Sequence, residues 1–205
     1  MTGREPAWMD VSALPTTTFG HRDLGWWGTL GFVVIEGMTL FICALSYFYL
    51  RRNFVLWPPG HTQLPGLIAP AIQCALMLLS WWPVRLADKS ARRLDLPALR
   101  RWMIVMTLFG FAFCVLRWFE LHALHTRWDS DAYGSIVWLT LIFHTTLLVF
   151  EAGETATLTV MLHAKPSERL FSDASDNALY WYFMTGVWIV LAAIVYLVPL
   201  LRGVP

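Results

Sequence analysis

The sequence predicts an all-α membrane protein, a bundle of five transmembrane helices. Apolar residues make up 57% of the 205 residues and charged residues 14%, which is far from the mix of a water-soluble domain. Five apolar runs are long enough for a helix to cross the hydrocarbon core; they cover residues 25–50, 64–82, 102–124, 135–162 and 178–201. We therefore expect residues 1–24 to form a polar cytoplasmic tail and residues 25–205 to form one transmembrane domain.

The first run, residues 25–50, carries a single charged residue, Glu36, close to its midpoint. A carboxyl group in lipid is costly unless it faces protein or water. Two interpretations stay open. Glu36 can be a protonated carboxyl that hydrogen-bonds a neighbouring helix and fixes packing, or a group that handles protons or faces a partner.

The second run, residues 64–82, contains no charged residue, and the third, residues 102–124, contains Arg117 and Glu120 near its end. Residues three apart lie on the same side of a helix. These two can pair with each other or extend to the lipid headgroups. An ion pair with a structural role is the simpler interpretation.

The fourth run, residues 135–162, contains His144, Glu151 and Glu154 at spacings of seven and three, which places them near one stripe of the helix. One histidine with two glutamates is similar to a di-iron bundle, but such a site needs a Glu-x-x-His pair on a second helix. The other runs supply no such pair, so we expect hydrogen-bonded packing or a polar subunit contact. The fifth run, residues 178–201, is rich in aromatic residues.

The distribution of Lys and Arg predicts the orientation, because basic loops stay on the cytoplasmic side. Ten lie before the first run, between the second and third, or between the fourth and fifth, and four lie on the opposite side. The N-terminus is therefore expected inside and the C-terminus outside. A formal net charge of only +1 argues against a nucleic-acid partner.

Two segments in the first half of the chain carry a family resemblance. WWGTLGFVVIEGMTLFICALSYFYLRR, residues 26–52, is similar to the helix with one intramembrane glutamate in subunit III of the haem–copper oxidases, and Glu36 falls on that glutamate. FCVLRWFEL, residues 113–121, is similar to a Phe-x-x-x-Gln-x-x-Glu pattern. Glu120 matches this pattern, and Arg117 replaces the glutamine.

Two further segments extend the resemblance to nearly the whole chain after the tail. Phe143 and His144 correspond to the start of Phe-His-Gly-Leu-His, with Leu147 in place of the second histidine. Residues 179–199 resemble a Tyr-Trp-His-Phe-x-Asp-x-x-Trp signature, in which Tyr182 stands for the histidine and Thr185 for the aspartate. The chain is thus similar to a divergent, short, five-helix bacterial form of subunit III.

The resemblance implies a non-catalytic subunit of a cytochrome c or quinol oxidase in the aerobic respiratory chain. No cofactor or metal is expected in this chain, whereas haem and copper are expected in partner subunits, above all the catalytic subunit I. The resemblance further implies bound phospholipid, stabilisation of the catalytic subunit, support of proton uptake through Glu36, and access for oxygen. Localisation in a bacterial inner membrane follows from the same likeness.

Two alternatives remain beside the oxidase. A nitric oxide reductase can have an accessory protein of this fold. An independent small transporter or proton channel could use His144, Glu151 and Glu154 as its path, although transporters usually show inverted repeats or helices broken near the midplane, and the prolines here lie toward the ends of the runs.

Overall fold

Five long helices form most of the computed structural model, which describes residues 17–59 and 62–201. They are α1 (Leu24–Arg52), α2 (Ile68–Arg92), α3 (Leu96–His122), α4 (Ala132–Ala164) and α5 (Arg169–Ala192). A 3₁₀ turn, η1 (Gly20–Arg22), precedes α1, while α5 continues through a π turn, η2 (Ala193–Leu197), into η3 (Val198–Leu200). Each apolar run corresponds to one helix, which confirms the helical fold class. Residues 1–16 of the expected tail lie outside the described residues.

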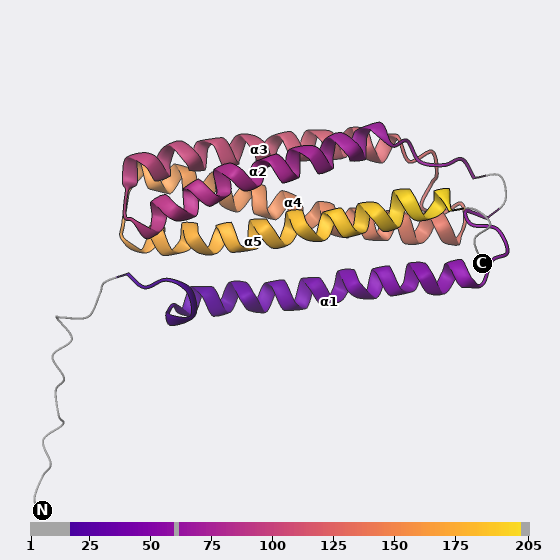
Figure 1. Ribbon diagram of the computed structural model, residues 1–205, viewed down its shortest axis with the longest axis horizontal. Helices are drawn as coiled ribbons and strands as arrows, with labels where there is room; N and C mark the ends of the chain where they lie inside the picture. Colours follow the sequence, from indigo (N-terminus) through magenta and orange to yellow (C-terminus); the bar gives the residue numbers. More distant parts are fainter. Residues whose placement is uncertain (1–16, 60–61, 202–205) are drawn as a thin grey trace, which may run out of the picture.

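Helices α2 to α5 pack together as a four-helix bundle, and α1 lies along the outside of this bundle against α4 and α5 (Figure 1). Successive helices run in opposite directions. Helix α1 buries only three side chains, those of Leu40, Cys43 and Tyr47. Most of its surface is therefore apolar and open to the surroundings.

Within the described residues, four helices are long and apolar enough to cross a membrane: α1, α3, α4, and α5 with its continuation to Leu200. The chain is therefore a multi-pass membrane protein. Helix α2 is not among the helices that are long and apolar enough. Residues 64–67 of its apolar run lie outside the helix, and its last turns contain charged residues between positions 85 and 92. The span expected there stays a prediction.

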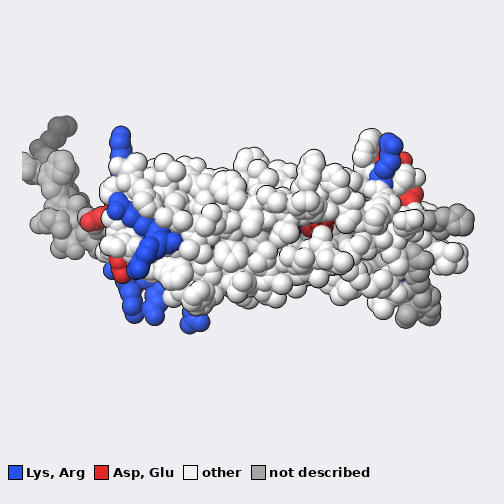
Figure 2. Space-filling view, turned by 90° about the horizontal axis from the view of Figure 1, so that it is seen from above, with Lys and Arg blue, Asp and Glu red and all other residues white. Residues whose placement is uncertain are grey.

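The helices extend beyond the apolar runs at the end where the basic residues gather. Helix α3 begins at Leu96 rather than at residue 102, and α5 begins at Arg169 rather than at residue 178. Most of the basic residues that we expected in a loop between the second and third runs thus belong to helix ends. An apolar run measures the hydrocarbon thickness, while helical hydrogen bonding continues into the headgroup region with Lys and Arg extending to water. On the face in Figure 2, Lys and Arg lie at the two ends and are absent from the belt between them.

The connection between α2 and α3 is three residues long. Leu94 adopts a left-handed conformation (φ 56°), and its N–H donates to the Ala91 carbonyl at 3.0 Å while the N–H of Asp95 donates to that of Ser90 at 3.0 Å. This pair of bonds closes the end of α2 as a Schellman motif. Asp95 then begins α3, since its carboxylate accepts from the N–H of Ala98 at 3.1 Å.

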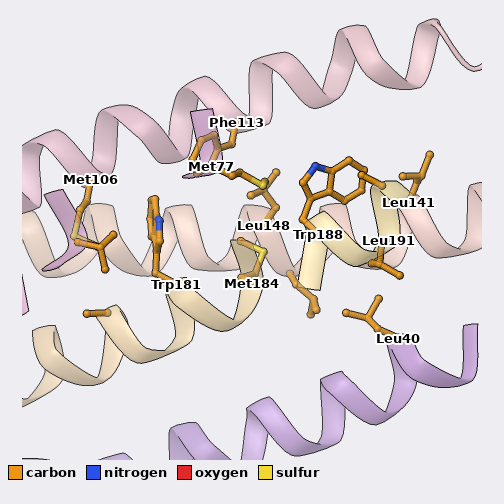
Figure 3. Close-up of a cluster of buried hydrophobic side chains, with 14 of the residues drawn as sticks. Leu40, Met77, Met106, Phe113, Leu141, Leu148, Trp181, Met184, Trp188 and Leu191 are labelled. Atoms are coloured by element: carbon orange, nitrogen blue, oxygen red, sulfur yellow. The ribbon is translucent and has the colours of Figure 1, made fainter. Parts of the chain in front are cut away.

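The bundle core is built from large aromatic and sulfur-containing side chains, as Figure 3 shows for α2, α3 and α5. Trp181 and Trp188 are among the largest fully buried side chains, and the ring centroids of Trp181 and Phe113 are 5.7 Å apart. Helices α3 and α4 approach closely at Gly110, where an added Cβ would lie 3.1 Å from that of Ala152. Small residues at such a crossing allow the backbones to come together.

Candidate functional site

Polar side chains gather at two places inside the helix assembly. The first group, the carboxylate cluster, lies between α1, α4 and α5 and consists of Glu36, Glu151, Glu154, Asn177 and Tyr180. The second, the arginine cluster, lies between α3, α4 and α5 and consists of Arg117, Glu120, His144 and Trp188. The first group brings α1 together with α4 and α5, which are distant from it in sequence, and the second lies among three consecutive helices.

Glu36 joins α1 to α5. The Tyr180 hydroxyl donates a hydrogen bond to Glu36 Oε2. One residue further along α1, an added Cβ on Gly37 would lie only 3.4 Å from the Phe183 ring, so the two helices approach closely at this level. The structure thus gives Glu36 a partner across a helix interface, which a carboxyl group inside a membrane requires.

Glu151 is fully enclosed, with 1% of its surface exposed. The amide nitrogen of Asn177 donates to Glu151 Oε1 at 2.9 Å and also lies 3.0 Å from Thr155 Oγ1. The other carboxyl oxygen, Oε2, is buried without a hydrogen-bond partner. A buried oxygen in this state either carries a proton itself or accepts a hydrogen bond from a bound water.

Two further carboxyl groups, those of Glu154 and Glu36, lie near Glu151. Those of Glu154 and Glu36 both act on Glu151 electrostatically, and that of Asp173 acts on Glu154. Glu154 itself lies on the exposed surface of α4. Asp173 lies near the start of α5 with its carboxylate 3.9 Å from the Arg169 guanidinium. The acids therefore form a series from the end of the bundle to its interior.

The arginine cluster contains a fully buried ion pair, formed by Arg117 and Glu120. Arg117 and Glu120 are 1% and 0% exposed, and their charged groups are 3.0 Å apart. The Arg117 guanidinium also stacks over the Trp188 ring at 3.7 Å from its centroid, a distance at which cation–π attraction is strong. Of the two expectations for this pair, mutual pairing is confirmed and extension to the headgroups is wrong, because the side chains turn into the bundle.

His144 is engaged through both ring nitrogens. Its Nε2 lies 3.1 Å from the Met184 carbonyl oxygen, which can only accept; its Nδ1 lies 3.1 Å from Arg117 Nη2, which can only donate. The imidazole therefore carries its proton on Nε2 and is neutral. Neither nitrogen is free to bind a metal, and among the described residues no three His, Cys, Asp or Glu side chains converge as metal ligands do.

The stripe expected along the fourth apolar run is divided between the two clusters. His144 belongs to the arginine cluster, while Glu151 lies near Glu154 on the same helix and near Glu36 on another. Seven residues of helix span about 10 Å, so members of one stripe meet different neighbours. Sequence reasoning missed Asn177. It lies just before the fifth apolar run, and its amide beside an apolar segment was the only signal of a buried partner.

Comparison with curated proteins finds relatives of similar sequence. No family model matches the chain. It is 25% identical over 182 residues to "Cytochrome c oxidase subunit 3" of Synechocystis sp., which covers 87% of this chain and 77% of that protein. It is 29% identical over 176 residues to a "Probable cytochrome c oxidase subunit 3" of Mycobacterium tuberculosis, covering 81% of this chain and 85% of that protein.

A third relative has a higher sequence identity to this chain. The chain is 31% identical over 150 residues to a "Probable cytochrome c oxidase subunit 3" of Nocardia farcinica, which covers 69% of this chain and 71% of that protein. The similarity therefore extends over most of both proteins, and it accompanies a multi-pass helical architecture with Glu36 in the first long helix. The chain belongs to the cytochrome c oxidase subunit III family of the haem–copper oxidases, as a divergent member.

Proposed function

We propose that this chain is the non-catalytic subunit III of a haem–copper terminal oxidase and packs in the membrane against the catalytic subunit I. The observation that carries the proposal is the likeness to three proteins named for this subunit, over 69–87% of the chain. Haem and copper would reside in the partner subunits. Both nitrogens of His144 are already engaged here, which supports a structural role for this histidine rather than ligation of a metal.

The part of the subunit that we assign to proton handling is Glu36. Its carboxyl group is held by the Tyr180 hydroxyl at the interface of α1 and α5, and further carboxyl groups lie beside it. We assign to it the support of proton uptake by the oxidase, and with it the lifetime of the enzyme during turnover.

We further assign a lipid-binding surface to α1. This helix contacts the bundle along one side, and it exposes large apolar side chains such as Phe32, Ile35 and Phe41. Phospholipid chains cover such a surface without loss of hydrogen bonds, since they require none. Bound lipid beside α1 would also form an apolar route for oxygen.

The topology that fits this role has five spans, with the N-terminus inside and the C-terminus outside a bacterial inner membrane. Helix α2 then crosses despite its polar end, because Arg85, Lys89 and Arg92 lie in its last turns and can reach the inner headgroups. The short connection to α3 lies on the same side and carries Arg93.

The experiment is isolation of the tagged chain from its native membrane in mild detergent, with mass spectrometry of the partners and a reduced-minus-oxidised optical spectrum. Haem bands and a copper-containing catalytic subunit are expected. A partner with an iron site in place of copper would instead support the nitric oxide reductase alternative. A colourless protein that purifies alone would overturn the proposal.

The role of Glu36 is tested in the same preparation by Glu36→Ala and Glu36→Gln, with Tyr180→Phe as the variant that removes only its hydrogen bond. We expect slower proton uptake and a shorter active lifetime in all three, because each disturbs the same carboxyl group. If uptake, lifetime and lipid content are unchanged in the alanine variant, Glu36 contributes to packing only.

A further inference from the structure

Glu151 is a buried acid with no cation beside it. The groups that act on its carboxyl are Glu154, Glu36 and the Asn177 amide, and none of them is positively charged. Tyr180, whose hydroxyl bonds Glu36, belongs to the same surroundings. Since Glu151 is 1% exposed, water cannot stabilise a full charge on it, and two more acids nearby oppose that charge further.

Glu120 provides a comparison within the same molecule. It is as deeply buried as Glu151, but the Arg117 guanidinium lies 3.0 Å from its carboxylate. A permanent cation at this distance keeps a carboxylate ionised. Glu151 has a neutral amide in the corresponding place, 2.9 Å from Oε1. The two acids therefore differ in what they can bind: Glu120 is neutralised by an ion pair, and Glu151 is neutralised by a proton.

We propose that the carboxylate cluster is a proton-binding site centred on Glu151, and that Glu154 and Asp173 connect it to the end of the bundle where α4 meets α5. Glu154 lies one turn from Glu151, about 4.5 Å along the helix axis toward that end. Asp173 acts on Glu154 and lies four residues from the start of α5, about 6 Å along its axis. Its carboxylate also contacts exposed Arg169, so this member of the series reaches the aqueous boundary.

The transfer changes only O–H bonds. Once Glu151 has given its proton to Glu36, a proton from the Glu154 carboxyl reaches Glu151 Oε2 through a bridging water. The O–H bond of Glu154 and one O–H bond of the water break, and one O–H bond forms on the water and one on Glu151. Glu36, which accepts a hydrogen bond from the Tyr180 hydroxyl, is the group that exchanges this proton with Glu151. Asp173 returns a proton to Glu154 from the surface.

This inference rests on the proposed function in one respect, because it takes the role of Glu36 in proton uptake as its context. It adds the residue that holds the proton and the side from which the proton comes. In the proposed orientation this side is the inner one. Nothing in the site requires the haem–copper subunit for the binding of the proton itself.

The test is infrared spectroscopy of the intact complex, in which a protonated carboxyl gives a C=O stretching band distinct from that of a carboxylate. We expect such a band in the wild type and its loss in Glu151→Gln. In Glu154→Gln we expect the band to shift, because this variant removes a neighbouring carboxyl from the surface of α4 and leaves the core intact. The matched control is Glu120→Gln. It removes a glutamate that is equally buried but ion-paired, and should leave the band unchanged.

Proton uptake during turnover gives the second readout. Slower uptake is expected in Glu154→Gln and in Asp173→Asn, with unchanged optical spectra of the haem groups. A carboxyl band that persists in Glu151→Gln would overturn the inference even if the complex contains haem and copper. A band that is lost as expected in a chain isolated without haem would support the proton site and reject the oxidase role, so the two failures are distinguishable.

Discussion

The buried ion pair of Arg117 and Glu120 allows the sharpest test of the packing. We consider Arg117→Gln, Glu120→Gln and the double variant as a thermodynamic cycle. Glutamine keeps a polar side chain of similar length at each position and removes the charge. At position 117, glutamine is also the residue found in the family pattern.

The magnitudes follow from the contacts. Removing one partner of a buried pair leaves an uncompensated charge and costs about 3–5 kcal/mol of folding free energy. Arg117→Gln also loses the stacking on Trp188 at 3.7 Å, worth about 2 kcal/mol for a desolvated cation. Removing both charges leaves neither unpaired, so the double variant should lose less than the two single variants together. We expect a coupling free energy of about 3 kcal/mol, above the roughly 0.6–1.7 kcal/mol found for neutral hydrogen bonds between membrane helices.

The assay is reversible unfolding in mixed micelles with an increasing fraction of denaturing detergent, followed by far-ultraviolet circular dichroism. The control cycle uses Arg127 and Asp129, whose charged groups are 2.9 Å apart but lie in an exposed loop. The hydrogen bond from Arg127 lowers the pKa of the Asp129 carboxyl, yet water screens both charges, and no measurable coupling is expected. If the coupling free energy of the Arg117–Glu120 pair is as small as that of the control, the conclusion that these two residues form a buried ion pair is refuted.

Three further predictions concern the helices and their connections. Gly110→Val should destabilise the fold by about 1–3 kcal/mol in the same unfolding assay, because added carbon atoms would collide with Ala152 across the α3–α4 crossing. Leu94→Gly should stabilise it by up to about 1 kcal/mol, since glycine adopts the left-handed conformation at the end of α2 without steric strain. In a variant without the native cysteines, a membrane-impermeant maleimide should label Val55→Cys in intact cells and Arg93→Cys only after lysis; equal labelling of both from outside would show that α2 does not cross the membrane.

The sequence predicted the five helices because long apolar runs depend on one dominant energy, the transfer of side chains into hydrocarbon. It placed several helix ends wrongly, because charged turns continue the backbone hydrogen bonding outside that region. The start of α3 at Leu96 illustrates this: the Asp95 cap and the Leu94 turn are local features, while hydropathy alone starts the helix six residues later.

The candidate site was predictable only in part. Glu36, Arg117, Glu120, His144, Glu151 and Glu154 stand out as polar residues in apolar runs. Spacing along one helix predicts the Arg117–Glu120 pair but not the rest of the grouping, because the other partners come from other helices. The hydrogen bond from Tyr180 to Glu36 requires α1 to lie against α5, and the bond from Asn177 to Glu151 requires the offset between α4 and α5. Neither contact is local in sequence.

The position of the two clusters along α4 determines the side from which a proton on Glu151 can be exchanged. His144 lies seven residues from Glu151 in the direction of the α3–α4 connection, about 10 Å along the axis, and its ring contacts the Arg117 guanidinium. Toward that end the Glu120 carboxylate is held by the Arg117 guanidinium, and Nδ1 of His144 accepts from the same guanidinium, so neither group is placed to relay a proton from Glu151. The carboxyl groups of Glu154 and Asp173 lie toward the other end. A proton-binding site inside the membrane can in this way serve one side only and still prevent a leak across the subunit.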